Sequence, residues 1–133
     1  MQSIFVDTGA WYAAMVRKDR DQLAAKQFLL SNTLPLITSD YVMDETVTLL
    51  QSRIGHSYAV RFLDMLQTSQ KTQLIYLAPT QVAATATLFR NRPDKGWSFT
   101  DCSSFVLMQE YQIYIACAFD EHFHQAGFQV EPK

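Results

Sequence analysis

The sequence predicts an α/β domain with a mainly parallel central sheet of about four to five strands and helices on both faces. Short apolar runs rich in β-branched and aromatic residues alternate with longer segments of helical periodicity. Strands separated by helices pair in parallel, because each helix carries the chain back across the sheet. The predicted strands cover residues 3–7, 34–38, 73–77, 113–119 and 128–130, and the predicted helices cover residues 9–17, 21–30, 40–54, 56–68, 81–90, 101–108 and 121–126.

The first strand is the centre of the prediction. Its apolar run, Ile4-Phe5-Val6, has no polar interruption, as expected of a strand buried on both faces in the middle of a sheet. The strand ends at Asp7 and passes directly into a helix. Open parallel sheets bind ligands at the carboxyl ends of their strands. Asp7 is therefore a candidate site residue.

The length and composition indicate one globular unit, residues 1–133. Hydrophobic residues make up 48% of the chain and charged residues 18%, which is typical of a folded protein with a substantial core. We expect a soluble, cytoplasmic protein without a membrane partner, because the sequence has no leader pattern and no apolar run of bilayer length. Cys102 and Cys117 lie in apolar stretches without metal-binding spacing, which favours reduced core thiols.

The net charge of −2 disfavours a nucleic-acid partner at first sight, since phosphate binding needs a basic surface. The balance changes if some acids are set aside for a metal site. With four of the thirteen acids at such a site, nine acids remain against eleven lysines and arginines. The rest of the surface then has a small positive excess, and bound cations would offset the site itself.

The predicted helix 40–54 carries an acid on its inner face. Val42, Glu45 and Leu49 share one stripe of the helix, whereas Asp44 lies on the opposite, solvent-facing stripe. A carboxylate among apolar neighbours is costly unless it is paired or bound to a metal. Glu45 is therefore either a metal ligand or the partner of an arginine such as Arg53 or Arg61.

The loop of residues 91–96 is basic. Arg90, Arg92 and Lys95 lie close together beside Trp97, and this mixture of cations and an aromatic could hold a single-stranded nucleic-acid backbone and stack a base. An ordinary surface turn would have the same composition.

Two further acids occur at element boundaries. Ser98-x-x-Asp101 has the spacing of a helix capping box, and Asp120 follows the apolar strand 113–119. Parallel strands place Asp7 and Asp120 at the same edge of the sheet, where the helices bearing Asp101 and Glu45 also begin. Each acid alone could be a helix cap or an ion-pair partner.

Four converging carboxylates would repel one another, so the arrangement requires a compensating charge. Oxygen ligands without a cysteine or histidine set favour Mg²⁺ or Mn²⁺ over zinc. Such ions, held at an open sheet edge, suit hydrolysis of phosphodiester bonds. Thr8 and Thr100 each adjoin a proposed ligand and could orient it or a metal-bound water.

Four segments together resemble the motifs of PIN-domain ribonucleases, in the order and spacing of that family and over essentially the whole chain. They are Phe5-Val6-Asp7-Thr8, Asp44-Glu45-Thr46, Ser98-Phe99-Thr100-Asp101-Cys102-x-Ser104-Phe105 and Phe119-Asp120-x-His122-Phe123.

The similarity is to the small stand-alone members that act as toxins of VapBC toxin-antitoxin pairs. The resemblance implies a PIN-like fold, Mg²⁺- or Mn²⁺-dependent endonucleolytic cleavage of RNA, and metal ligands at Asp7, Glu45, Asp101 and Asp120. It also implies a cognate antitoxin and a homodimer. Two alternatives stay open at this point: a PIN-domain RNase of RNA processing or decay, and a PIN-like module that binds RNA or protein without cutting.

The sequence gives weaker support to a catalytic role for the histidines and to a phosphatase reaction. His122 and His124 would diverge on a short helical turn, which favours surface or structural roles for both. A phosphatase with Asp7 as nucleophile is disfavoured, because Gly9 stands where that chemistry usually has its proton donor.

Overall fold

The structure, a computed structural model, describes residues 2–133. Its five strands form one parallel sheet in the order β3-β2-β1-β4-β5, which confirms the predicted fold class. The strands are β1 (Ile4–Val6), β2 (Leu36–Ser39), β3 (Thr72–Ile75), β4 (Ile115–Cys117) and β5 (Gln129–Glu131).

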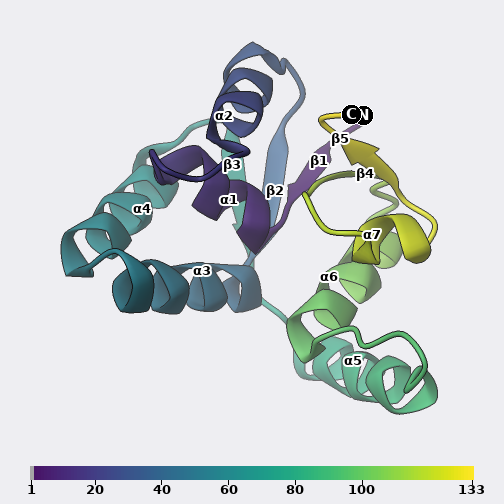
Figure 1. Cartoon of the computed structure of the whole chain (residues 1–133). Helices are drawn as coiled ribbons and strands as arrows, with labels where there is room; N and C mark the ends of the chain where they lie inside the picture. The colour runs from purple at the N-terminus through teal and green to yellow at the C-terminus, as the bar shows by residue number, and fades with distance from the viewer. Residues whose placement is uncertain (1) are drawn as a thin grey trace.

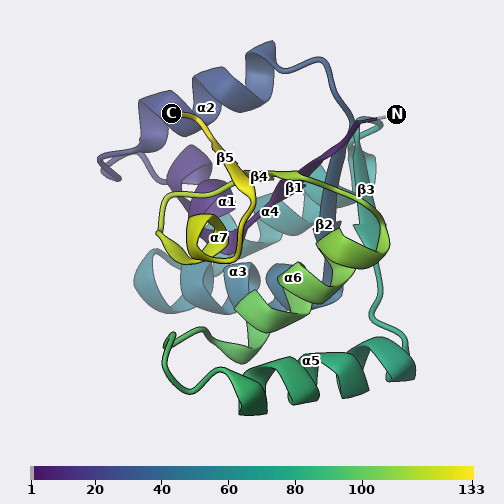
Figure 2. The same ribbon diagram turned by 90° about the vertical axis from the view of Figure 1, so that its right-hand side faces the viewer.

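Seven helices connect and follow the strands within these residues. In Figure 1, α1, α2 and α4 lie on one side of the strands, and α5, α6 and α7 lie on the other. Figures 1 and 2 both place α5 outside α6, so that α6 is the inner helix of that side. The helices are α1 (Thr8–Met15), α2 (Gln22–Ser31), α3 (Asp40–Arg53), α4 (His56–Thr68), α5 (Pro79–Asn91), α6 (Phe99–Glu110) and α7 (His122–Gln125).

Strand β1 is the central strand, as its apolar sequence predicts. All three of its residues are buried, and it pairs in parallel with β2 on one side and β4 on the other. The register places Val6 opposite Cys117, so β1 and β4 end at the same level. Asp7 and Asp120, the acids that follow these two strands, therefore lie at the same edge of the sheet.

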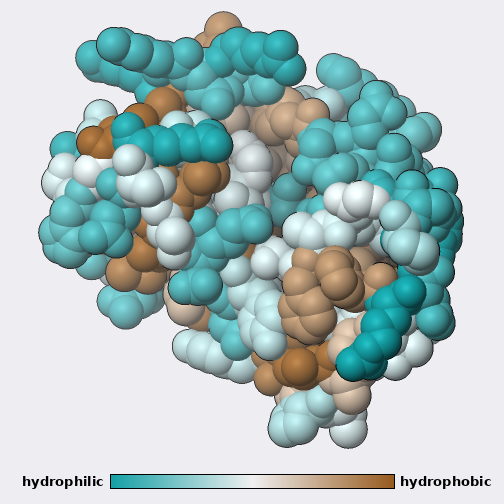
Figure 3. All heavy atoms as spheres, turned by 60° about the horizontal axis from the view of Figure 1, so that its bottom comes forward, coloured by the Kyte–Doolittle hydropathy of each residue, from teal (hydrophilic) through white to brown (hydrophobic). Residues whose placement is uncertain are grey.

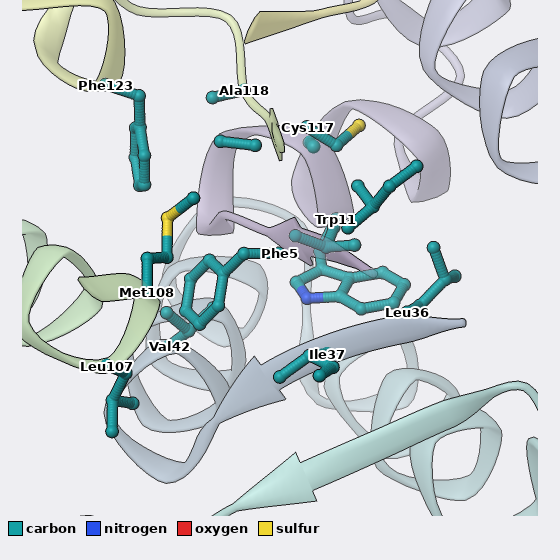
Figure 4. Close-up of a cluster of buried hydrophobic side chains, with 14 of the residues drawn as sticks. Phe5, Trp11, Leu36, Ile37, Val42, Leu107, Met108, Cys117, Ala118 and Phe123 are labelled. Carbon is teal, nitrogen blue, oxygen red and sulfur yellow. The ribbon is translucent and has the colours of Figure 1, made fainter. Parts of the chain in front are cut away.

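The core surrounds β1. Figure 4 shows buried side chains from β1, β2, α1, α3, α6 and α7 gathered in one cluster. Phe5 and Phe105 both pack against Phe123, with ring centroids 6.4 and 5.0 Å apart. Cys102 and Cys117 are buried free thiols, as expected. Burial anchors the strand ends and the start of α6 to one rigid interior.

Most bounds differ from the predicted ones by one or two residues, including two helix starts and one strand. Helix α5 begins at Pro79 rather than at residue 81, because proline is accepted in the first turn of a helix. Helix α6 begins at Phe99, since Ser98 is its N-cap, and Asp101 lies inside its first turn. Strand β4 is shorter than the predicted 113–119 and ends at Cys117. Among residues 2–133 no helix is long and apolar enough to cross a membrane.

Candidate active site

Asp7 and Asp120 follow the ends of two neighbouring parallel strands. The backbone N–H of Asp7 donates to the carbonyl of Cys117, which continues the β1–β4 pairing up to the site. Asp7 is only 4% exposed, whereas the side chain of Asp120 is 45% exposed. Asp7 precedes α1, but its carboxylate makes no capping hydrogen bond. Helix capping therefore does not account for this buried charge.

Asp101 is held at the start of α6 by the predicted capping box. Its Oδ2 accepts the backbone N–H of Ser98 at 3.0 Å, and its own N–H donates to the Ser98 hydroxyl at 2.9 Å. The same Oδ2 lies 2.7 Å from Nδ1 of His122. One carboxylate oxygen thus takes both contacts, and Oδ1 has no partner within residues 2–133.

Glu45 lies in the second turn of α3, on the half-buried face, while its neighbour Asp44 is exposed as predicted. The helix begins where the Ser39 hydroxyl accepts the N–H of Val42. Within the described residues Glu45 forms no ion pair, and the two arginines considered as partners stack on tyrosines instead. The ion-pair alternative for Glu45 therefore has no support in the structure.

The other three acids act electrostatically on Asp7. Burial raises the pKa of Asp7 well above its ordinary value, and the negative charges of Asp120, Asp101 and, more weakly, Glu45 raise it further. A buried carboxylate with like-charged neighbours favours either a proton or a bound cation. The structure thus places the other three predicted acids close enough to Asp7 for their charges to affect it.

Of the two threonines expected to support the acids, Thr8 is buried, and its Oγ1 is the one fully buried side-chain oxygen or nitrogen without a hydrogen-bond partner in residues 2–133. An unpaired buried hydroxyl is unfavourable in a folded protein and indicates a missing partner. Thr100 lies at the start of α6 and lines a surface hollow together with Glu45 and Leu49.

His122 is the residue that sequence reasoning undervalued. We expected a surface or structural role, but its ring is half-buried and contacts Asp101, and Nδ1 lies 3.8 Å from Oδ2 of Asp120. Asp101, Asp120 and His122 each present one ligand atom, and these atoms lie within 4.8 Å of one another. The sequence feature that could have indicated this contact is the position of His122 two residues after Asp120. The Asp120 Oδ1 atom accepts the backbone N–H of His122, and this bond turns the chain back toward the site.

The basic loop needs one correction. Trp97 is only 7% exposed and packs edge-on against Phe105, so its ring is a core element and is not free to stack on a base. Arg92 lies over the indole at 5.2 Å and is paired with Asp94. Arg90 is exposed and Lys95 is half-buried. The sequence placed these residues together correctly, but burial removes Trp97 from the predicted RNA-binding set.

These acids form a fitting site for a divalent metal ion. Carboxylate oxygens that carry net negative charge in a partly buried setting are the donors that hard divalent cations prefer. The raised pKa of Asp7 and the unpaired hydroxyl of Thr8 both favour a ligand that the protein alone does not supply. A bound cation would remove both penalties.

The family model of the PIN domain matches residues 4–129. The chain belongs to the PIN-domain family. This confirms the resemblance inferred from the four motif segments.

Relatives in the family give a closer comparison. The chain is 36% identical over 132 residues to the protein named 23S rRNA-specific endonuclease VapC20 in two strains of Mycobacterium tuberculosis, a match that covers 98% of this chain and 99% of VapC20. The crystal structure of Mycobacterium tuberculosis VapC20, described as a sarcin-ricin loop cleaving toxin, has a TM-score of 0.89 and 32% identity over 94% of this chain and 95% of that chain.

A more distant structure shares the fold. VapBC2 from Rickettsia felis, solved with a DNA fragment from its promoter, has a TM-score of 0.70 at 14% identity, over 98% of both chains. At this identity the similarity supports the PIN fold alone.

Proposed function

We propose that this protein is an endoribonuclease that hydrolyses RNA phosphodiester bonds with bound Mg²⁺ or Mn²⁺, and that it is the toxin of a type II toxin-antitoxin pair. The observation that carries the proposal is the cluster of Asp7, Asp101, Asp120 and Glu45, in which burial and like charges raise the pKa of Asp7. Full-length similarity to an rRNA-specific endonuclease supports the choice of RNA as substrate.

The proposed roles follow from the positions of the side chains. Asp7, Asp101, Asp120 and Glu45 hold the metal, with Thr8 and Thr100 beside them, and His122 orients Asp101. A divalent ion held by these residues would supply activation of water and compensation of the charge on the scissile phosphate. The protein supplies a buried carboxylate directly after β1, Asp7, and a half-exposed carboxylate, Asp120, on the open side of the site.

The proposed partners follow from the relatives. VapC20 is described as a toxin, and we propose that a cognate antitoxin protein binds this chain and blocks its activity. We also keep the homodimer as a proposal, to be tested by light scattering of the purified protein.

The test uses purified protein and RNA. 23S rRNA is the first substrate to try, because VapC20 is named for its action on it. We expect cleavage with Mg²⁺ or Mn²⁺ and none with EDTA. Asp101→Asn and Glu45→Gln should abolish cutting, whereas Asp44→Asn removes an exposed carboxylate one residue away and should cut normally.

Two results would overturn the assignment. One is cleavage by folded Asp101→Asn at the wild-type rate, since the acid cluster would then be dispensable. The other is equal loss in Asp44→Asn and Glu45→Gln, which would mean that overall surface charge matters rather than the cluster. Circular dichroism of each variant establishes that it is folded.

A further inference from the structure

A groove opens beside the acid cluster, between α1, the following turn and α3. It has a volume of about 560 Å³ and is lined by Gly9, Tyr12, Lys18, Arg53 and Asp120, among others. In the space-filling view with the lower side of the molecule brought forward, this face is hollowed near its centre, and both hydrophilic and hydrophobic residues border the hollow (Figure 3). The groove includes one of the four acids in its wall.

The wall of the groove lies near the buried end of the cluster. Gly9, in the groove wall, lies two residues after Asp7, and a β-carbon at Gly9 would lie 3.9 Å from Oδ2 of Asp7. A chain lying in the groove would thus contact Asp120 and lie near Asp7.

Two cations in the groove are free to bind an anion. Arg53 lies over the ring of Tyr12, with its guanidinium carbon 5.6 Å from the ring centroid, and neither Arg53 nor Lys18 forms an ion pair within residues 2–133. Stacking on an aromatic ring leaves the N–H groups at the edge of a guanidinium available for phosphate oxygens.

The acids of the same turn are already occupied. Asp19 Oδ1 accepts the backbone N–H of Asp21, and Asp21 pairs with Arg20 at 3.7 Å. These contacts order the turn and do not involve Lys18 or Arg53. The groove lining thus carries three cations, Lys18, Arg20 and Arg53, and three acids, Asp19, Asp21 and Asp120. Of the cations, Lys18 and Arg53 form no ion pair within residues 2–133.

The surface hollow on the other side of Leu49 is lined by acids and has no basic residue in its lining. That hollow, of about 340 Å³, is lined by Asp44, Glu45, Thr48 and Thr100 and contains no lysine or arginine. Glu45, Leu49 and Arg53 are spaced four residues apart on α3, so Arg53 stands about 12 Å beyond Glu45 along the helix. Of these two hollows, the groove alone is lined by lysine and arginine.

We propose that the groove between α1 and α3 holds the ribose-phosphate backbone of RNA next to the bond that is cut, with Arg53 and Lys18 as its phosphate contacts. The proposal rests on the proposed function for its substrate class. Charged contacts to successive phosphates give binding without base specificity and a strong dependence on salt. Tyr12 positions Arg53 by stacking.

The experiment compares two arginines that each stack on a tyrosine ring. Arg53 stacks on Tyr12 in the groove, whereas Arg61 stacks on Tyr58 at 4.9 Å and does not line the groove. Binding of a short fluorescein-labelled single-stranded RNA is measured by anisotropy at several salt concentrations, with Asp7→Asn as the non-cleaving background. Arg53→Gln and Lys18→Gln are tested against Arg61→Gln.

We expect Arg53→Gln to weaken RNA binding about tenfold and to lower the slope of log K against log salt by about 0.7, the amount for one lost phosphate contact on a single strand. Arg61→Gln should change neither. In single-turnover cleavage, Arg53→Gln should raise the half-saturating concentration and leave the maximal rate within about twofold. Mn²⁺ affinity and Tm should stay at the parent values.

Equal RNA binding by Arg53→Gln and Arg61→Gln would overturn the proposal. So would an Arg53→Gln variant that loses the cognate antitoxin but keeps RNA affinity, since the groove would then be a protein-binding surface. The binding assay does not depend on cleavage, so a protein that never cuts but loses RNA affinity in Arg53→Gln would refute the proposed function and leave the groove assignment standing.

Discussion

His122 Nδ1 lies 2.7 Å from Oδ2 of Asp101, and this contact joins the short helix α7 to the first turn of α6. A carboxylate oxygen only accepts hydrogen bonds, so the ring nitrogen carries the proton of this bond. With Ser98 donating to the same oxygen, Asp101 is fixed in one orientation. Loss of a partner that orients a metal-binding side chain typically lowers metal affinity.

We therefore expect His122→Ala to weaken Mn²⁺ binding by about 10–100-fold, as is typical when such a partner is lost. His122→Asn can place an amide N–H near the position of Nδ1 and should recover much of the affinity. Isothermal titration calorimetry measures both. Unchanged Mn²⁺ affinity in His122→Ala would show that the capping box alone orients Asp101.

Asp7→Asn should stabilise the metal-free protein at neutral pH by a few degrees in Tm. The native pKa of Asp7 is raised above 3.8, so between 3.8 and the native pKa the folded protein binds more protons than the unfolded chain. The contribution of the Asp7 carboxyl to the free energy of unfolding therefore falls as the pH rises through that interval. The advantage of Asp7→Asn should be absent below pH 3.8 and reach a plateau above the native pKa.

Urea unfolding in EDTA over a pH series checks this, and saturating Mn²⁺ should reverse the order because the ion binds the folded wild type more tightly. A metal-free Asp7→Asn protein that is clearly less stable at neutral pH would mean that the carboxylate has a structural role.

Thr8→Val should leave the metal-free protein at least as stable as the wild type, because an isosteric methyl replaces a buried hydroxyl without a partner. Cleavage should slow, since we expect the hydroxyl to find its partner in the loaded site. Thr8→Ser keeps the hydroxyl and serves as the matched control for activity. Thermal unfolding and single-turnover cleavage provide the two readouts, and a loss of metal-free stability would contradict the expectation.

Trp97→Ala should destabilise the protein by about 3–5 kcal/mol, the usual range for an aromatic removed from a core. The indole packs on Phe105, and its Nε1–H donates to Gln125 Oε1 at 3.1 Å. Arg90→Ala, at an exposed position of the same loop region, should change stability by about 0.5 kcal/mol or less. Denaturant unfolding measures the loss of stability in both variants. Similarly small losses in the two would mean that the Trp97 ring is not part of the core.

The fold was predictable to the extent that it depends on local pattern. The apolar run before Asp7 identified the central strand, and the Ser98-x-x-Asp101 spacing identified a capping box that the structure contains. The bounds of α5 and α6 moved by two residues because helix starts depend on which residue caps them. Asp44 and Glu45 were assigned to opposite faces by helical periodicity alone.

By itself the sequence determined the order of strands and helices, the family, and which acids stand at the ends of elements, since these follow from short-range patterns and motif spacing. The tertiary structure decided which side chains meet. It turned His122 onto Asp101, buried Trp97, and set Arg53 and Lys18 beside the acids, all through packing between elements far apart in the chain. Contacts of this kind depend on side-chain direction and burial, which periodicity along one element does not specify.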